Sequence, residues 1–139
     1  MPRYFFFYGT LMAGAGNAVA LAAHRHLGQE QPATIRGALW AIDDPGGWYP
    51  ALLPGAGLVH GALYRVLSGF GAKDLALLDA YEGAEYVREP VQVRLEAGMV
   101  EAQAYVWAGA LPEGAVALGH GDFARFLAEG GHRPFGAAD

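Results

Sequence analysis

The chain opens with Tyr4-Phe5-Phe6-Phe7-Tyr8-Gly9-Thr10-Leu11, in which five consecutive residues are aromatic. This run predicts a buried strand, because a strand packed on both faces hides both rows of its side chains. The strand is expected to stop at Gly9, and a glycine there marks a sharp turn or a close approach of the backbone. Two interpretations stay open: an ordinary turn, or a loop whose backbone N–H groups bind an anion.

Composition limits the classes of protein that the chain can belong to. Its 139 residues are 53% hydrophobic and 17% charged, which predicts one compact domain over residues 1–139. The net charge is -5, with nine basic residues that form no run, so we expect no nucleic-acid partner. No stretch has the roughly 18 to 20 apolar residues of a membrane span, so we expect no membrane partner.

The chain contains no cysteine, which excludes thiolate nucleophiles, disulfides and cysteine metal sites. Residues 4–23 carry no charge and resemble a signal peptide, but Gly9-Thr10 interrupts their apolar run early. We therefore expect this segment to belong to the mature fold and the protein to be cytoplasmic.

Apolar periodicity and turn residues predict strands with short helices inserted between them. The expected helices cover residues 17–26, 72–82 and about 122–129, and Gly37 marks a bulge in a strand. The expected strands cover residues 33–43, 51–53, 58–67, 91–95 and 99–108, with a loop at 44–50, a turn at 54–57 and a hairpin turn at 97–98. This order predicts an α+β fold with a mostly antiparallel, strongly curved sheet or barrel.

Several kinds of catalytic site are disfavoured by the residues that are present. Ser68 is the only serine and lacks the glycine pattern of a nucleophile elbow, so a serine hydrolase is not expected. Of the five histidines only His24 and His26 are close in sequence, and an i, i+2 pair on a helix points to different sides. We therefore expect no metal site, and the glycine spacings match no nucleotide-binding motif.

Glu82 is the candidate for acid–base chemistry. It lies seven residues after Leu75 and projects between Leu75 and Leu78, on the apolar face of the helix expected over 72–82. Burial and the negative end of the helix dipole both oppose its ionised form, so its pKa is expected to be raised. The alternative is that the last helical turn frays and the carboxylate is solvated.

Tyr86 and Arg88 follow Glu82 closely, and they share one face if the segment Glu85-Tyr86-Val87-Arg88 starts a strand. Gln103, Tyr105 and Trp107 likewise share one face of the last hairpin strand. These polar and aromatic faces either line a cavity or lie half-exposed on the outside of the sheet.

The combination of motifs resembles the γ-glutamylcyclotransferase-like family. Its anchor points are Tyr8-Gly9-Thr10-Leu11, Leu78-Asp79-Ala80-Tyr81-Glu82-Gly83 and Tyr86-x-Arg88. The resemblance continues through Gly37-x-Leu39-Trp40, Tyr49-Pro50-Ala51, Gly61-x-Leu63-Tyr64 and Tyr105-x-Trp107, and so spans about residues 3–108. The segment Tyr49-Pro50-Ala51 is closer to the γ-glutamylamine cyclotransferase branch than to the glutathione-degrading one.

The resemblance implies a small mixed barrel with flanking short helices and a pocket at one end. It implies that Tyr8, Gly9, Thr10 and Leu11 hold the α-carboxylate of a γ-glutamyl group, largely through backbone N–H groups, and that Glu82 is catalytic. We add Tyr86 and Tyr105 as candidate substrate-binding residues. The implied reaction is an acyltransferase- or lyase-type cyclisation that releases 5-oxoproline and an amine, with no cofactor and no metal.

Three hypotheses follow for the function. The first is a γ-glutamyl cyclotransferase, a monomer or homodimer, acting on a small γ-glutamyl amine or peptide. The second is a non-catalytic module that binds a small carboxylate, in which the pKa of Glu82 need not differ from about 4.3. The third is a structural or interaction protein, which predicts no pocket joining residues 8–11 to Glu82.

Overall fold

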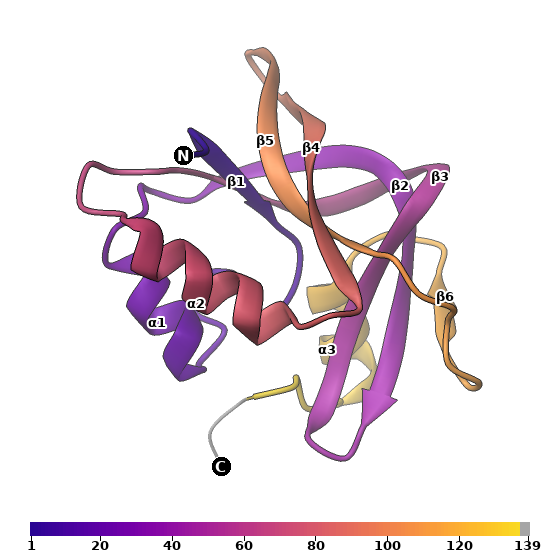
Figure 1. Cartoon of the computed structure of the whole chain (residues 1–139). Coiled ribbons are helices and arrows are strands. Elements are labelled where there is room, and N and C mark those ends of the chain that lie inside the picture. Colours follow the sequence, from indigo (N-terminus) through magenta and orange to yellow (C-terminus); the bar gives the residue numbers. More distant parts are fainter. Residues whose placement is uncertain (137–139) are drawn as a thin grey trace.

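The computed structural model describes residues 1–136, in which five strands close into a barrel. The strands run in the order β3-β1-β5-β4-β2, and β2 pairs with β3 to complete the circle, while β6 extends the sheet beside β2 (Figure 1). The elements are β1 (Tyr4–Phe7), α1 (Ala18–His24), β2 (Gln31–Asp44), β3 (Gly47–Arg65), α2 (Ala72–Glu82), β4 (Tyr86–Leu95), β5 (Gly98–Trp107), β6 (Val116–Leu118) and α3 (Phe123–Gly130).

The pairings confirm a mixed and mostly antiparallel sheet. Strand β1 lies between β3, with which it pairs antiparallel, and β5, with which it pairs parallel. The other pairings among the named strands of residues 1–136 are antiparallel, including the long β2–β3 hairpin and the β4–β5 hairpin. The α+β barrel expected from the sequence is therefore confirmed.

The alternation of side chains along β1 explains why its sequence is aromatic throughout. Phe6 and Tyr8 belong to the core inside the barrel, with Leu63 and Val93. Phe5 and Phe7 belong to a second core under the helices, where Leu78 of α2 is completely buried. Both faces of the strand are therefore apolar, and β1 joins the barrel to its helical layer.

Helices α1 and α2 lie side by side against one flank of the barrel, and α3 lies on another side (Figure 1). Asn17 caps α1, because its side-chain oxygen accepts a hydrogen bond from the N–H of Ala20 at 2.8 Å. Helix α2 has the bounds expected from the sequence and ends at Gly83, whose φ of 84° favours glycine. None of the helices in residues 1–136 is long and apolar enough to cross a membrane.

Two expectations about the strands are wrong. Of the predicted loop at 44–50, Asp44 ends β2, residues 45–46 form a two-residue turn and residues 47–50 belong to β3, as does the predicted turn at 54–57. The glycines in these segments allow β2 and β3 to approach closely at the predicted bulge after Gly37. A Cβ on Gly55 would lie 2.8 Å from the Cβ of Ala38. The β4–β5 turn consists of residues 96–97, and Gly98 begins β5.

Candidate functional site

A cavity of about 220 Å³ opens between the loop after β1, the C-terminal end of α2 and the first residues of β4. Every residue that was given a catalytic or substrate-binding role from the sequence lines it. The lining is Phe6, Phe7, Tyr8, Gly9, Thr10, Leu11, Asp44, Tyr49, Pro50, Tyr81, Glu82, Glu85, Tyr86, Tyr105, Trp107 and Phe135. A pocket therefore joins residues 8–11 to Glu82, contrary to the prediction of the structural-protein hypothesis.

The loop after β1 is held by its carbonyl groups. The carbonyl of Gly9 accepts from the N–H of Met12 at 3.1 Å, and that of Thr10 accepts from Nδ2 of Asn17 at 2.6 Å. Because N–H and C=O point in opposite directions across a trans peptide, the N–H groups of Thr10 and Leu11 point away from these partners. Within residues 1–136, the N–H groups of residues 9–11 have no hydrogen-bond acceptor. They are therefore available to an anion in the pocket.

Gly9 is required by a close approach of two backbone segments. A Cβ at this position would lie 2.3 Å from Cγ of Pro50, which is far inside van der Waals contact. The glycine therefore lets the loop lie directly against β3, and the proline ring forms part of the same pocket wall. The close approach expected at Gly9 is therefore present, together with a turn closed by the bond from the N–H of Met12 to the carbonyl of Gly9.

Glu82 has the electrostatic character expected of a general acid/base. Burial raises the pKa of Glu82 from 4.5 to about 8, although the residue keeps partial exposure through the pocket. Its carboxyl has no hydrogen-bond or ion-pair partner within residues 1–136. An ionised form is thus neither well hydrated nor neutralised by the protein, which is the physical reason for the raised pKa.

Four tyrosines lie close enough to Glu82 for its charge to raise their pKa values, after the larger effect of burial. Each O–H donates elsewhere: Tyr8 to the carbonyl of Tyr105, Tyr81 to Oγ1 of Thr10, Tyr86 to the carbonyl of Pro50 and Tyr105 to Oδ1 of Asp79. A phenol has a single proton to donate, so none of the four stabilises the Glu82 carboxylate. They form a neutral wall around it.

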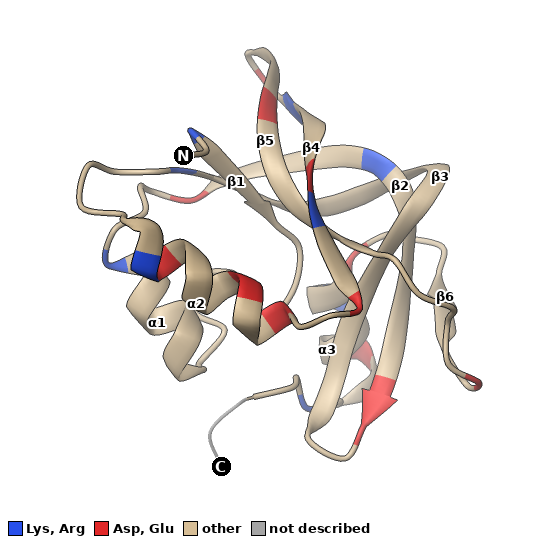
Figure 2. Ribbon diagram, viewed as in Figure 1, with Lys and Arg blue, Asp and Glu red and all other residues tan. Residues whose placement is uncertain are grey.

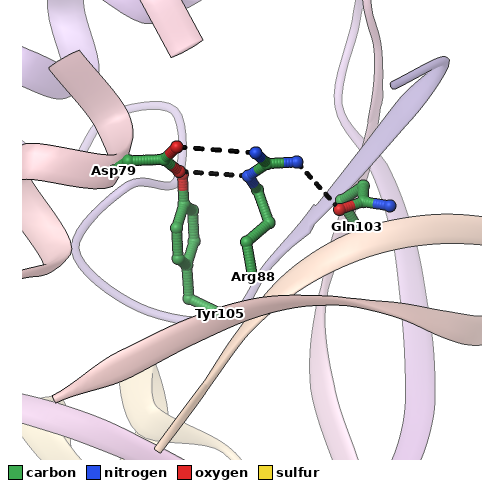
Figure 3. Close-up of polar contacts among 4 residues, drawn as sticks. All are labelled: Asp79, Arg88, Gln103 and Tyr105. Carbon is green, nitrogen blue, oxygen red and sulfur yellow. Dashed lines mark hydrogen bonds and ion pairs between the residues drawn. The ribbon is translucent and has the colours of Figure 1, made fainter. Parts of the chain in front are cut away.

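A polar network anchors α2 to the β4–β5 hairpin one helical turn before Glu82 (Figure 3). Nε of Arg88 binds Oδ1 of Asp79 at 3.0 Å, and the hydroxyl of Tyr105 donates to the same oxygen at 2.6 Å. The Arg88 guanidinium also donates to Oε1 of Gln103 at 3.0 Å. Arg88 and Gln103 lie outside the pocket lining, and their network fixes the last turns of the helix that carries Glu82.

The structure adds pocket residues that the sequence did not single out. Asp44 and Glu85 come from the end of β2 and from just before β4, and Phe135 comes from the C-terminal segment. That segment pairs with Trp48, whose N–H donates to the carbonyl of Arg133 at 2.8 Å and whose carbonyl accepts from the N–H of Phe135 at 2.7 Å. This pairing between distant segments brings Phe135 to the pocket, and no local sequence pattern indicates it.

No group of three or more histidine, aspartate or glutamate side chains in residues 1–136 is arranged to hold a metal ion.

A protein-family comparison matches most of the chain. The family described as "Gamma-glutamyl cyclotransferase, AIG2-like" matches residues 5–125, which include the loop after β1, α2 and the β4–β5 hairpin. No curated protein matches the chain.

Solved structures share the fold. An AIG2-like protein from Mus musculus is 26% identical with a TM-score of 0.62, and the match covers 81% of each chain. Protein ytfP from Escherichia coli is 28% identical with a TM-score of 0.57, over 86% of this chain and 95% of that one. YkqA from Bacillus subtilis is 18% identical with a TM-score of 0.70, and 94% of this chain spans only 43% of its length.

Proposed function

We propose that this chain, which belongs to the γ-glutamyl cyclotransferase, AIG2-like family, converts a γ-glutamyl amine or peptide to 5-oxoproline and a free amine. One observation carries the proposal. The unpartnered carboxyl of Glu82, with its pKa raised to about 8, lines the same pocket as a loop with three unsatisfied N–H groups. The family membership and this geometry support the same reaction class independently.

The loop binds one end of the substrate. The N–H groups of Gly9, Thr10 and Leu11 are proposed to hold the α-carboxylate of the γ-glutamyl group. Charge-assisted hydrogen bonds from backbone N–H groups suit a carboxylate, and no Lys or Arg lines the pocket within residues 1–136 to compete for it. Fixing this carboxylate directs the α-amine and the γ-carbonyl toward the interior.

The reaction is intramolecular. The α-amine nitrogen attacks the γ-amide carbonyl carbon and forms the C–N bond of a five-membered ring, after which the bond to the leaving nitrogen breaks. The enzyme must hold the glutamyl chain folded, and orientation of this kind can lower a barrier by several kcal/mol. The restricted volume of about 220 Å³ supports such confinement.

Glu82 is proposed to move the proton. It takes a proton from the attacking amine and returns it to the departing nitrogen, so the carboxyl ends in its original state. A pKa of about 8 suits both steps near neutral pH, because the group is neither a strong acid nor a strong base there. This route requires neither metal nor cofactor.

Tyr8, Tyr86 and Tyr105 are proposed to contact the substrate through their rings. Their hydroxyl protons are committed to protein acceptors, so they hold the walls of the pocket in place rather than exchange protons. We propose that the protein works in the cytoplasm as a monomer or homodimer on a small-molecule substrate.

The test is a panel of γ-glutamyl amines and peptides assayed for 5-oxoproline. We expect turnover of at least one compound by the wild-type chain and none above background by Glu82→Gln, with both proteins folded. Stoichiometric binding of the panel without turnover would favour the carboxylate-binding module. Wild-type activity in Glu82→Gln would remove Glu82 from the mechanism.

A further inference from the structure

The loop that would hold the substrate carboxylate has no Lys or Arg beside it in the pocket lining within residues 1–136. Residues 4–24, from β1 to the end of α1, include no Lys, Arg, Asp or Glu and are tan throughout in Figure 2. The affinity of the loop for an anion therefore depends on how firmly its N–H groups are oriented and how strongly they are polarised.

The N–H of Thr10 stands at the end of a chain of hydrogen-bonded peptides. It shares a trans peptide unit with the carbonyl of Gly9, and this carbonyl accepts from the N–H of Met12 at 3.1 Å. The N–H of Met12 shares the next peptide unit with the carbonyl of Leu11, which lies 2.7 Å from Nε2 of His24. The chain thus runs from the His24 ring through two peptide units to the N–H of Thr10.

The imidazole of His24 is the donor at the start of this chain. A carbonyl oxygen only accepts hydrogen bonds, so Nε2 carries a hydrogen in both the neutral and the protonated ring. The ring packs edge-on against Tyr64 and Phe7, with centroids 4.6 and 6.1 Å away. Tyr64 is completely buried, and its hydroxyl accepts from the N–H of Ala13 in the same loop at 3.0 Å. Packing therefore fixes the direction in which Nε2 donates.

A second, shorter chain ends at the N–H of Leu11. This N–H shares a peptide unit with the carbonyl of Thr10, which accepts from Nδ2 of Asn17 at 2.6 Å. Asn17 is the N-cap of α1 and His24 is its last residue, so side chains at the two ends of one helix support both N–H groups. Hydrogen bonds in such chains polarise one another, which makes the terminal N–H a stronger donor.

We propose that His24 is a positioning residue for the substrate carboxylate, because its hydrogen bond to Leu11 orients and polarises the N–H of Thr10. This inference rests on the proposed function and identifies a residue outside the pocket that sets the affinity of the anion-binding loop. His24 does not line the pocket, so its effect on the ligand passes through the backbone. Loss of the donor would leave the carbonyl of Leu11, a buried residue, without its partner and would free this peptide to rotate.

The test compares two γ-glutamyl alkylamides that differ only in the α group, which is a carboxylate or a carboxamide. We expect wild type to prefer the carboxylate about 10-fold or more in kcat/KM, because hydrogen bonds to a charged acceptor are stronger. His24→Leu should raise KM for the carboxylate about 3- to 10-fold with little change in kcat, as for a hydrogen bond made equally in the ground and transition states. The KM for the carboxamide should change less than about 2-fold, because a neutral acceptor gains less from a polarised donor.

Two further variants separate positioning from a general loss of structure. His24→Gln carries an amide N–H that can reach the carbonyl of Leu11, and it should restore most of the preference for the carboxylate. His26→Leu is the matched control, since the ring of His26 has no hydrogen bond within residues 1–136 and does not line the pocket. It should leave the kinetic constants of both substrates unchanged. Urea unfolding checks that each variant is folded.

Binding of the same two compounds in the Glu82→Gln background, measured by calorimetry, separates this inference from the proposed function. If neither compound yields 5-oxoproline but the carboxylate binds better, and His24→Leu weakens that binding while His26→Leu does not, the reaction is wrong and the role of His24 stands. An equal loss of affinity for both compounds in His24→Leu would mean that His24 supports only the fold, and would overturn the inference. So would an unchanged affinity of folded His24→Leu for the carboxylate, or no binding of the carboxylate to any of these proteins.

Discussion

Glu82→Gln is expected to change how the stability of the protein depends on pH. Burial raises the pKa of Glu82 from 4.5 to about 8. Below pH 4.5 the carboxyl is neutral in the folded and unfolded states and has no effect. As pH rises toward 8 the unfolded chain ionises and the folded chain does not, so the folded state loses stability until pH passes the folded pKa.

The magnitude follows from the difference between the two pKa values. At about 1.4 kcal/mol per pH unit, a rise from 4.5 to about 8 corresponds to about 5 kcal/mol. Partial exposure of Glu82 through the pocket lets water screen the charge, so we expect about 2 to 4 kcal/mol. Gln cannot ionise, and the variant should therefore gain that amount relative to wild type between acidic and alkaline pH.

The assay is urea unfolding of wild type and Glu82→Gln at several pH values between about 5 and 8.5. Other titrating groups contribute to both proteins, so the difference between the two unfolding free energies isolates Glu82. Glu89→Gln, a change at an exposed position of β4 that does not line the pocket, is the control for removal of a carboxylate. A difference for Glu82→Gln that does not vary with pH would refute the account of its burial.

Three further outcomes are expected. The kcat/KM for a γ-glutamyl amine should rise with pH through a limb near 8, because the base form of Glu82 accumulates above its pKa; a limb near the ordinary glutamate range would contradict this. Gly9→Ala should lower the free energy of unfolding by about 1 to 3 kcal/mol, since its Cβ would lie 2.3 Å from the ring of Pro50. Gly119→Ala is the control and should change the free energy of unfolding little, because its Cβ would meet no atom within 4 Å. Equal unfolding midpoints for the two variants would argue against the close approach at Gly9. Asp79→Asn should lower kcat several-fold and change KM less, because it weakens the contacts that hold the end of α2 in place. Glu89→Gln is the control and should leave both kinetic constants unchanged.

The sequence alone was sufficient to predict features that depend on a single helix or strand. Aromatic residues at every position of β1 require two buried faces, and the structure supplies the barrel core and the helical layer. The bounds expected for helix α2 are those of the structure, and Gly83 follows it with a φ of 84°, which favours glycine. Within that helix, Glu82 follows Leu75 by two turns, so its direction toward the pocket could be predicted as well.

The features that were missed depend on contacts between distant segments. Pro50, Gly55 and Gly57 suggested loops, but β3 continues through them because its neighbours approach closely there. The bond from Tyr105 to Asp79 joins residues 26 positions apart, and Phe135 reaches the pocket through pairing of its segment with β3. Side chains placed by such pairings have no periodic pattern that a single sequence could show.

The most direct test of the central claim is identification of the product made from a γ-glutamyl amine by nuclear magnetic resonance. The account predicts 5-oxoproline and one equivalent of free amine from the wild-type chain, no glutamate, and neither product from folded Glu82→Gln. Release of glutamate would mean that water and not the α-amine attacks the carbonyl, and would contradict the account. Release of 5-oxoproline by Glu82→Gln at the wild-type rate would contradict the role given to Glu82.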